Sequence, residues 1–237
     1  MEIKSGNRTE LLRKIKGEVV DFKESPLYKE RIHNRVHPVI GEGNHHADIM
    51  FIGEAPGKTE AETGRPFSGQ AGKVLDELLK SVGIERKDVY ITNVVKDRPP
   101  MNRDPLPQEI ALYAPFLDRQ IGIIKPKVIV LLGRHSMKYI MEKFGLESQL
   151  TSISRMHGKV FEAEAGYGKI NPLASIESAP SSEETNEISH RPSREVPKDN
   201  EGGKVKIVPM YHPAAALYNP DLKSEMQKDF KILKELV

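Results

Sequence analysis

Two periods of apolar residues run along this chain, and together they predict an alternation of strands and helices. Short, mostly apolar runs are typical of strands buried on both faces, and they occur at residues 48–53, 88–92, 128–133 and 205–211. Apolar residues spaced at 3.6 predict helices at 9–15, 70–83, 107–123, 134–144 and 221–236. Residues 155–161 are expected to form one short further strand. The polar stretches 16–48 and 58–69 are expected to be loops.

Strands that alternate with helices indicate a largely parallel sheet. We therefore expect an α/β fold of three layers, α/β/α, with a mostly parallel central sheet and helices on both faces. A length of 237 residues suits a single domain, 1–237.

The segment from about 162 to 203 departs from the pattern. It is rich in Ser, Glu, Pro and Asn and has no sustained apolar period. We interpret it as a disordered insertion between two strands, because it cannot bury enough apolar area to fold. A tolerated surface insertion is the favoured interpretation, and a partner-binding or regulatory segment is the alternative.

Composition narrows the class of protein. The net charge of +2 is compatible with nucleic-acid binding but does not indicate it. The absence of cysteine excludes disulfides, a thiol nucleophile and thiolate-held metal sites. No apolar run approaches the ~20 residues of a membrane span, and residues 1–4 do not open a signal peptide. We expect a monomeric cytoplasmic protein that does not bind membranes.

Polar side chains stand at the ends of three predicted strands. Glu54 lies in a Gly-Glu-Ala-Pro-Gly turn, Asn93 follows 88–92, and His212 follows 205–211. Ligands of open α/β sheets bind at the carboxyl ends of strands, so these three side chains are expected to lie in the active site. The seven other histidines are interpreted as inert, and adjacent His45 and His46 lack a third metal ligand at a convincing spacing.

Several separated segments are similar to the motifs of one family. The segments are Gly-Glu-Ala-Pro-Gly at 53–57, Gly-Arg-Pro-Phe-Ser-Gly at 64–69, Ile-Thr-Asn-Val-Val-Lys at 91–96, Arg-Pro-Pro-Met-Asn-Arg at 98–103 and His-Pro-Ala-Ala-Ala-Leu at 212–217. In order and spacing they resemble the uracil-DNA glycosylases, closest to the family 4 branch. The resemblance runs from about residue 26 to 161 and resumes at 205–220. It implies a DNA-repair enzyme that flips uracil out of DNA and hydrolyses its N-glycosidic bond, leaving an abasic site.

The resemblance implies a role for each strand-end residue. His212 donates a hydrogen bond to uracil O2 as negative charge develops, and Glu54 positions water or supports the sugar cation. The Asn93 amide offers the donor and the acceptor that match uracil O4 and N3–H. Phe67 stacks on the flipped base, and Glu60 excludes the methyl group of thymine. The residues expected to line the base are Gly53, Ala55, Glu60, Phe67 and Asn93.

Holding DNA with a base extruded costs a few kcal/mol, so further contacts are expected. Backbone amides of glycine turns could meet phosphates, and basic side chains could neutralise them. Leu217 could wedge into the gap left by the base, or it could cap the sheet edge instead. The expected DNA contacts are Gly57, Ser68, Gly69, Gly72, Lys96, Arg98, Asn102, Arg103 and Leu217.

The chain also departs from the family pattern. The family usually holds an iron–sulfur cluster on four cysteines, and the matching positions here are Phe22, Ser25, Asp97 and Tyr113. We therefore expect no cluster, no metal and no other cofactor, with Phe22 and Tyr113 filling the volume by apolar packing. Ala61 stands where an aspartate is usual, so part of that loop's polar network is expected to be missing.

Other functions fit some of the same features. A glycosylase for another deaminated base, such as hypoxanthine, would keep the fold. A module could bind damaged DNA without cutting it, and an unrelated protein could use the glycine turns to bind a nucleotide. The joint presence of Glu54, Phe67, Asn93 and His212 favours the glycosylase.

Overall fold

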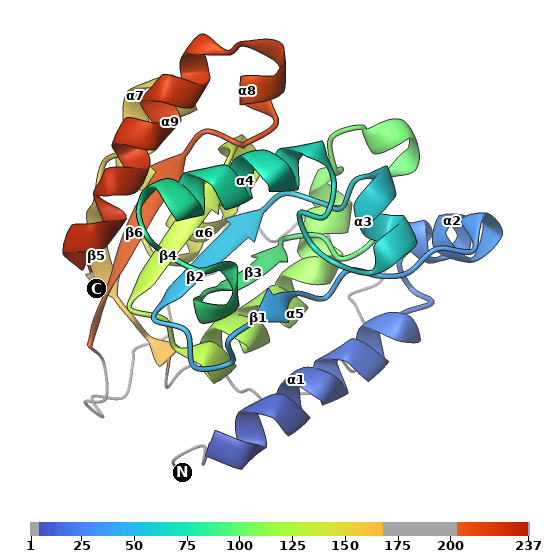
Figure 1. Ribbon diagram of the computed structural model, residues 1–237. Helices are drawn as coiled ribbons and strands as arrows, with labels where there is room; N and C mark the ends of the chain where they lie inside the picture. The colour runs from blue at the N-terminus through green and yellow to red at the C-terminus, as the bar shows by residue number, and fades with distance from the viewer. Residues whose placement is uncertain (1–4, 168–202, 237) are drawn as a thin grey trace.

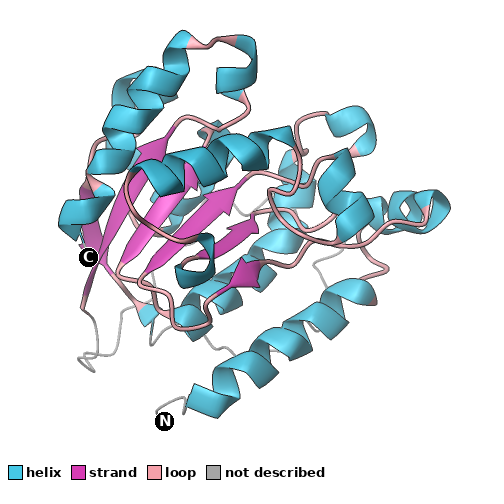
Figure 2. Ribbon diagram, viewed as in Figure 1, coloured by secondary structure: helices cyan, strands magenta, loops and turns pink. Residues whose placement is uncertain are grey.

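A six-stranded sheet forms the middle layer of the protein (Figures 1 and 2). The computed structural model describes residues 5–167 and 203–236. The strands lie in the order β1-β3-β2-β4-β6-β5; β3, β2, β4 and β6 run parallel, and the edge strands β1 and β5 are antiparallel to their neighbours. Their bounds are β1 Glu42–Gly43, β2 Ile49–Gly53, β3 Tyr90–Asn93, β4 Val128–Leu132, β5 Phe161–Glu164 and β6 Lys204–Met210.

Helices cover both faces of the sheet, as the alternation of elements predicts (Figure 1). Successive residues of β2 point to opposite faces, so Met50 and Ile52 pack with α1, α5 and α6, whereas Ile49 and Phe51 pack with α4 and α9. The expected three-layer α/β/α fold is confirmed. The helices are α1 Ser5–Val20, α2 Pro26–Asn34, α3 Lys58–Thr63, α4 Gln70–Ser81, α5 Pro107–Ile124, α6 Arg134–Lys143, α7 Ile153–Met156, α8 Ala215–Tyr218, α9 Asp221–Lys231 and α10 Leu233–Leu236.

Two expected loops contain short helices. Residues 16–48 contain the end of α1, which is longer than the helix expected at 9–15, and also α2 and β1; residues 58–69 contain α3. Ser25 caps α2 by accepting a hydrogen bond from the Leu27 amide at 3.1 Å, with Pro26 in the first turn. Gly64 ends α3 in the left-handed conformation. Both helices are short and mostly polar, so their capping residues predict them better than an apolar period does.

The boundaries predicted for residues 155–203 are partly wrong. Residues 153–156 form α7, and the strand expected at 155–161 begins only at Phe161. Its continuation to Glu164 pairs with β6, so the first residues of the expected disordered insertion are a strand. Phe161 and Ala163 pack on the core while the two glutamates between and after them face outward, which is the alternation of an edge strand. Residues 168–202, the bulk of the expected insertion, lie outside the described residues.

The parallel strands bring several chain segments to one edge of the sheet. The segments that follow β2, β3, β4 and β6 all begin at this carboxyl edge. Among the described residues, no helix has both the length and the apolar character needed to cross a bilayer.

Candidate active site

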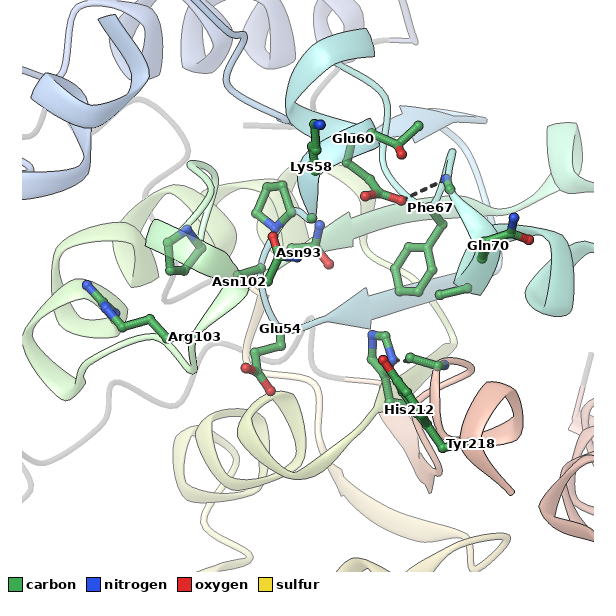
Figure 3. Close-up of a pocket in the computed structure, with 18 residues that line it drawn as sticks. Glu54, Lys58, Glu60, Phe67, Gln70, Asn93, Asn102, Arg103, His212 and Tyr218 are labelled. Atoms are coloured by element: carbon green, nitrogen blue, oxygen red, sulfur yellow. Dashed lines mark hydrogen bonds between the residues drawn. The ribbon is translucent and has the colours of Figure 1, made fainter. Parts of the chain in front are cut away.

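A cleft of about 460 Å³ opens at the carboxyl edge of the sheet (Figure 3). Residues from well-separated parts of the sequence line it: Glu54 after β2, Asn93 at the end of β3 and His212 after β6. Phe67 closes one side of it (Figure 3). The expected site residues that line the cleft are Glu54, Ala55, Gly57, Glu60, Phe67, Gly69, Asn93, Asn102, Arg103 and His212.

Gly53 allows Asn93 and Phe67 to meet. Gly53 and Asn93 are paired across β2 and β3. A Cβ atom on Gly53 would lie 2.3 Å from Asn93 Oδ1 and 2.8 Å from Phe67 Cζ, so any side chain there would displace both. Gly53 therefore contributes the space around the base-binding residues and does not itself line the cleft.

The position of Phe67 depends on a second glycine. A Cβ atom on Gly72 would lie 1.7 Å from the Phe67 carbonyl oxygen, so the glycine lets α4 pack against that backbone. Phe67 itself has a left-handed backbone, with φ 48°, and a buried ring. Gly72 was expected to meet a phosphate, and this expectation is wrong because Gly72 is buried against Phe67.

The His212 ring is neutral and points one nitrogen away from the backbone. It stacks on the Phe67 ring, with centroids 5.5 Å apart. Burial lowers the pKa of His212 to about 4, so the ring is uncharged at neutral pH. Its Nδ1 accepts a hydrogen bond from the Ala214 amide at 3.2 Å. The proton of the neutral ring is therefore on Nε2, which is left to donate to a bound group.

Glu54 lies beside three ionisable residues that the sequence did not lead us to expect at the site, Asp104, Arg134 and His135. His135 Nε2 is 3.7 Å from Glu54 Oε2 and 3.6 Å from Asp104 Oδ2, and Arg134 pairs with Asp104. Burial raises the pKa of Glu54 to about 7; the charge on Asp104 adds to the increase and Arg134 opposes it. Arg134 and His135 begin α6, one residue after the end of β4, so the strand-end argument applied to the other strands could have found them.

The same group raises the question of a metal ion. Glu54, Asp104 and His135 each offer a ligand atom, and these atoms lie within 4.8 Å of one another. However, the Arg134 guanidinium already pairs with Asp104, and Arg134 Nε donates to His135 Nε2 at 3.1 Å. We interpret the group as an ion-pair cluster that borders Glu54, because a guanidinium already occupies the place of a cation.

Glu60 links α3 to the residue that caps α4. Its Oε1 accepts a hydrogen bond from the Gly69 amide at 2.8 Å (Figure 3). The Gly69 amide, expected to meet a phosphate, is therefore already engaged, and that expectation is wrong for this amide. Ser68 Oγ lies 2.8 Å from Thr63 Oγ1, at the side of the same loop.

Lys96 was expected to contact DNA, and this prediction is wrong. The side chain is fully buried, and Nζ donates to Thr92 Oγ1 at 2.8 Å, to the Asn93 carbonyl at 2.6 Å and to Gln120 Oε1 at 2.6 Å. Burial lowers its pKa well below the ordinary value. Lys96 instead fixes the backbone of Asn93 from behind.

The two arginines of the 98–103 loop make contacts close to them in the sequence. Arg98 Nε donates to Asn102 Oδ1 at 2.7 Å. Arg103 donates two hydrogen bonds to the buried Glu109 carboxylate, at 2.8 and 2.6 Å. Arg103 also lines the cleft, whereas Arg98 and Leu217 do not. Phosphate contacts by Arg98 and Arg103 stay predictions.

The positions that match the family's cysteines form a buried polar network. The Tyr113 hydroxyl donates to Asp97 Oδ2 at 2.6 Å and is hydrogen-bonded to Ser25 Oγ at 2.9 Å. Arg31 Nη1 is 3.2 Å from Asp97 Oδ1, with both side chains almost fully buried. Phe22 packs edge-on against Tyr113, with ring centroids 5.6 Å apart.

The expected apolar filling is therefore right for Phe22 and incomplete for Tyr113, whose hydroxyl is part of the network. None of the four side chains offers sulfur, and the polar atoms already bond one another. An iron–sulfur cluster does not fit this site.

This network should contribute strongly to stability. We expect Asp97→Ala to lower the free energy of unfolding by about 3–5 kcal/mol, because it leaves the buried Arg31 cation unpaired. Tyr113→Phe removes one hydroxyl and should cost about 1 kcal/mol. Urea unfolding of both variants beside the unmodified chain measures the two effects. A smaller loss in Asp97→Ala than in Tyr113→Phe would contradict the pairing.

Known proteins are similar to this chain over most of its length. A family model described as the uracil DNA glycosylase superfamily matches residues 40–234. The type-4 uracil-DNA glycosylase of Sulfurisphaera tokodaii is 43% identical over 226 residues, which are 95% of this chain and 84% of the relative. That of Archaeoglobus fulgidus is 41% identical over 219 residues, 92% and 89% of the two chains. That of Saccharolobus solfataricus is 40% identical over 202 residues, which are 85% of this chain and 76% of the relative.

Proposed function

The chain belongs to the uracil DNA glycosylase superfamily, and from that membership we propose how its cleft removes uracil from DNA. The protein is a uracil-DNA glycosylase of DNA repair, a hydrolase of N-glycosyl bonds. One observation carries the proposed roles: Glu54, Phe67, Asn93 and His212, distant in sequence, line a single cleft.

Recognition of the base rests on Asn93 and Phe67. The Asn93 amide accepts from uracil N3–H and donates to O4, a pattern that cytosine does not match. Lys96 donates a hydrogen bond to the backbone carbonyl of Asn93, and Gly53 leaves the space that the Asn93 side-chain amide occupies. The Phe67 ring stacks on the extruded base. Glu60, tied to the Gly69 amide, stands at the cleft wall, where it excludes a methyl group on C5.

Cleavage separates charge between the base and the sugar. The electron pair of the bond between C1′ and N1 leaves with uracil, and the negative charge at O2 accepts a hydrogen bond from His212 Nε2–H. The ionised carboxylate of Glu54 stabilises the sugar cation and orients a water molecule. The water oxygen bonds to C1′ and its proton passes to Glu54. Because Ala55 adds no second carboxylate, bond breaking runs ahead of water attack.

The remaining proposals concern cofactors and partners. We propose that excision needs no cofactor, because the steps above use only side chains, water and DNA. We also propose that the protein acts as a monomer inside the cell, where its DNA substrate is. Iron and sulfide analysis of the purified protein tests the first point, and sedimentation tests the second.

Release of free base from labelled oligonucleotides tests the function. We expect uracil to be released from U·G and U·A duplexes, with hypoxanthine in the same sequence as the competing substrate. Tight binding without release of either base would indicate a module that binds damaged DNA. Faster release of hypoxanthine than of uracil would indicate the glycosylase for another deaminated base.

Changing Asn93 should change the choice of base. In Asn93→Asp a carboxylate cannot donate to uracil O4, so we expect kcat/KM for uracil to fall by about 5- to 150-fold, the cost of an unsatisfied buried acceptor. The same carboxylate can accept from the cytosine amino group, so the ratio of cytosine to uracil release should rise. Asn102→Asp, which changes another asparagine of the cleft wall, is the matched control. An unchanged base preference in Asn93→Asp would remove Asn93 as the reader.

A further inference from the structure

A buried lysine lies behind the residue that reads the base. Lys96 is among the largest side chains that are fully buried, and its Nζ donates to the backbone carbonyl of Asn93 at 2.6 Å. The side chain of the same Asn93 lines the cleft (Figure 3). A neutral donor would be enough to hold a backbone carbonyl, so an ionisable group at this place requires another explanation.

Every group that Lys96 Nζ bonds is an acceptor. The Thr92 hydroxyl donates its own proton to the Ile40 carbonyl at 2.6 Å, so Thr92 Oγ1 accepts from Nζ at 2.8 Å. The Gln120 amide nitrogen donates to the same Ile40 carbonyl at 2.9 Å, which turns Gln120 Oε1 toward Nζ at 2.6 Å. The Asn93 carbonyl is the third acceptor. Nζ is therefore the donor in all three hydrogen bonds.

Three acceptors fit an ammonium group. An ammonium has three N–H bonds, whereas a neutral amine has two and would turn its lone pair toward one of these oxygens. Burial lowers the pKa of Lys96, but the charge of Asp118 raises it, and hydrogen bonds donated by the charged form favour that form. Among the residues that the structure describes, no carboxylate forms an ion pair with Nζ, which bonds three neutral oxygens instead.

A buried cation without a counter-ion costs stability, and such groups tend to occur at functional sites. In the proposed reaction uracil leaves as an anion whose charge is shared by O2, N1 and O4. His212 donates to O2, and the Asn93 amide donates to O4. A cation behind Asn93 attracts this charge as it forms, because charges act over several ångströms in an interior of low dielectric. The base is neutral before the bond breaks, so the attraction is stronger in the transition state.

We propose that Lys96 is a buried cation that stabilises the departing uracil anion and holds the residue that binds it. Lys96 touches neither the base nor the sugar, so it is a positioning residue that acts through Asn93 and through its charge. This inference rests on the proposed function. It gives the lysine that the sequence suggested as a phosphate ligand a different anion to stabilise.

Release of uracil and of 5-fluorouracil from the same oligonucleotide, measured in single turnovers, tests the inference. Fluorine at C5 withdraws electrons and makes the base a more stable anion, so its release needs less help from the protein. We expect Lys96→Met to lower the rate of uracil release by about 10- to 100-fold, as loss of a charge that faces a developing anion predicts. The loss for 5-fluorouracil should be smaller, whereas a merely structural role would lower both rates by the same factor.

Two further variants separate the charge from packing. Gln120→Glu keeps the lysine and gives it a counter-ion, so it should cause the same selective loss for uracil. Arg31→Met is the matched control, since it removes a buried cation that Asp97 already neutralises. It should lower stability without changing the ratio of the two rates. An unchanged ratio in Lys96→Met and in Gln120→Glu would overturn the inference.

Nitrogen NMR of the unmodified chain gives a measurement that requires no variant. Lys96 Nζ should carry three protons at neutral pH, and an amine with two protons would overturn the inference. If the unmodified chain releases uracil but the ratio of rates is unchanged or Nζ is neutral, only the role of Lys96 is overturned. If the unmodified chain releases no uracil, the proposed function itself is contradicted.

Discussion

Replacing His212 with alanine is expected to lower the rate of uracil release by 10²–10³-fold, the usual loss when one donor to a developing anion is removed. The structure supports this size of effect because His212 is neutral and stacks on Phe67. The Ala214 amide donates to its Nδ1, which leaves the proton on Nε2 to be donated to uracil. The variant should still bind uracil-containing DNA, because the Asn93 amide and the Phe67 ring are untouched. Single-turnover kinetics and DNA binding, measured together, separate the two effects.

Two comparisons make this result specific. His33→Ala changes an exposed histidine of α2 and should leave the rate unchanged. His212→Asn keeps a neutral donor at the same place, so it should recover part of the lost rate. Because burial lowers the pKa of His212 to about 4, its titration should not affect the rate above about pH 5. A normal rate in His212→Ala would remove this residue from bond cleavage.

The strand-end residues could be predicted from sequence because their strands are strongly apolar and their order fixes a parallel sheet. That reasoning places Glu54, Asn93 and His212 at one edge. It cannot show the 2.3 Å approach that a side chain on Gly53 would make to Asn93, because that approach depends on the register between β2 and β3. The sequence indicates which strand ends meet, and the register decides how closely.

The errors come from contacts that the local sequence pattern does not reveal. Lys96 carries the charge expected of a phosphate ligand, but Gln120 of α5 and Thr92 of β3 supply its hydrogen bonds in the interior. A charged side chain alone does not reveal that burial. In the same way, Asp104 and His135 meet beside Glu54 only because a loop after β3 folds against the start of α6.

At the four positions where the family has cysteines, the contacts were predicted only in part. Their likeness to the family placed Phe22, Ser25, Asp97 and Tyr113 together, and three of them do bond one another. Arg31 could not be included from the family's pattern, because it comes from α2, a helix without an apolar period. The charge balance of the network therefore depends on a helix that only its capping residues, Ser25 and Pro26, indicate in the sequence.

Glu54→Gln should lower the rate of uracil release by 10²–10⁴-fold, as expected for loss of a carboxylate that accepts a proton. Burial raises the pKa of Glu54 to about 7, and only the ionised form can stabilise the sugar cation. In the unmodified chain kcat/KM should therefore rise about tenfold per pH unit up to about pH 7 and level off above it. Glu54→Gln should lose this rise, and a flat profile for the unmodified chain between pH 5.5 and 8 would contradict the assignment.

The same substitution should stabilise the protein, and only at higher pH. The pKa of Glu54 in the fold lies above the ordinary value of 4.5, so its contribution to stability is complete below about pH 4.5 and is lost as pH rises through 7. Glu54→Gln should thus raise Tm at pH 8 and leave it nearly unchanged at pH 4, whereas Glu62→Gln, an exposed carboxylate of α3, should change neither. A lower Tm for Glu54→Gln at pH 8 would show that the ionised carboxylate stabilises the folded protein. The expected gain would instead mark Glu54 as a residue whose charge costs stability and serves catalysis.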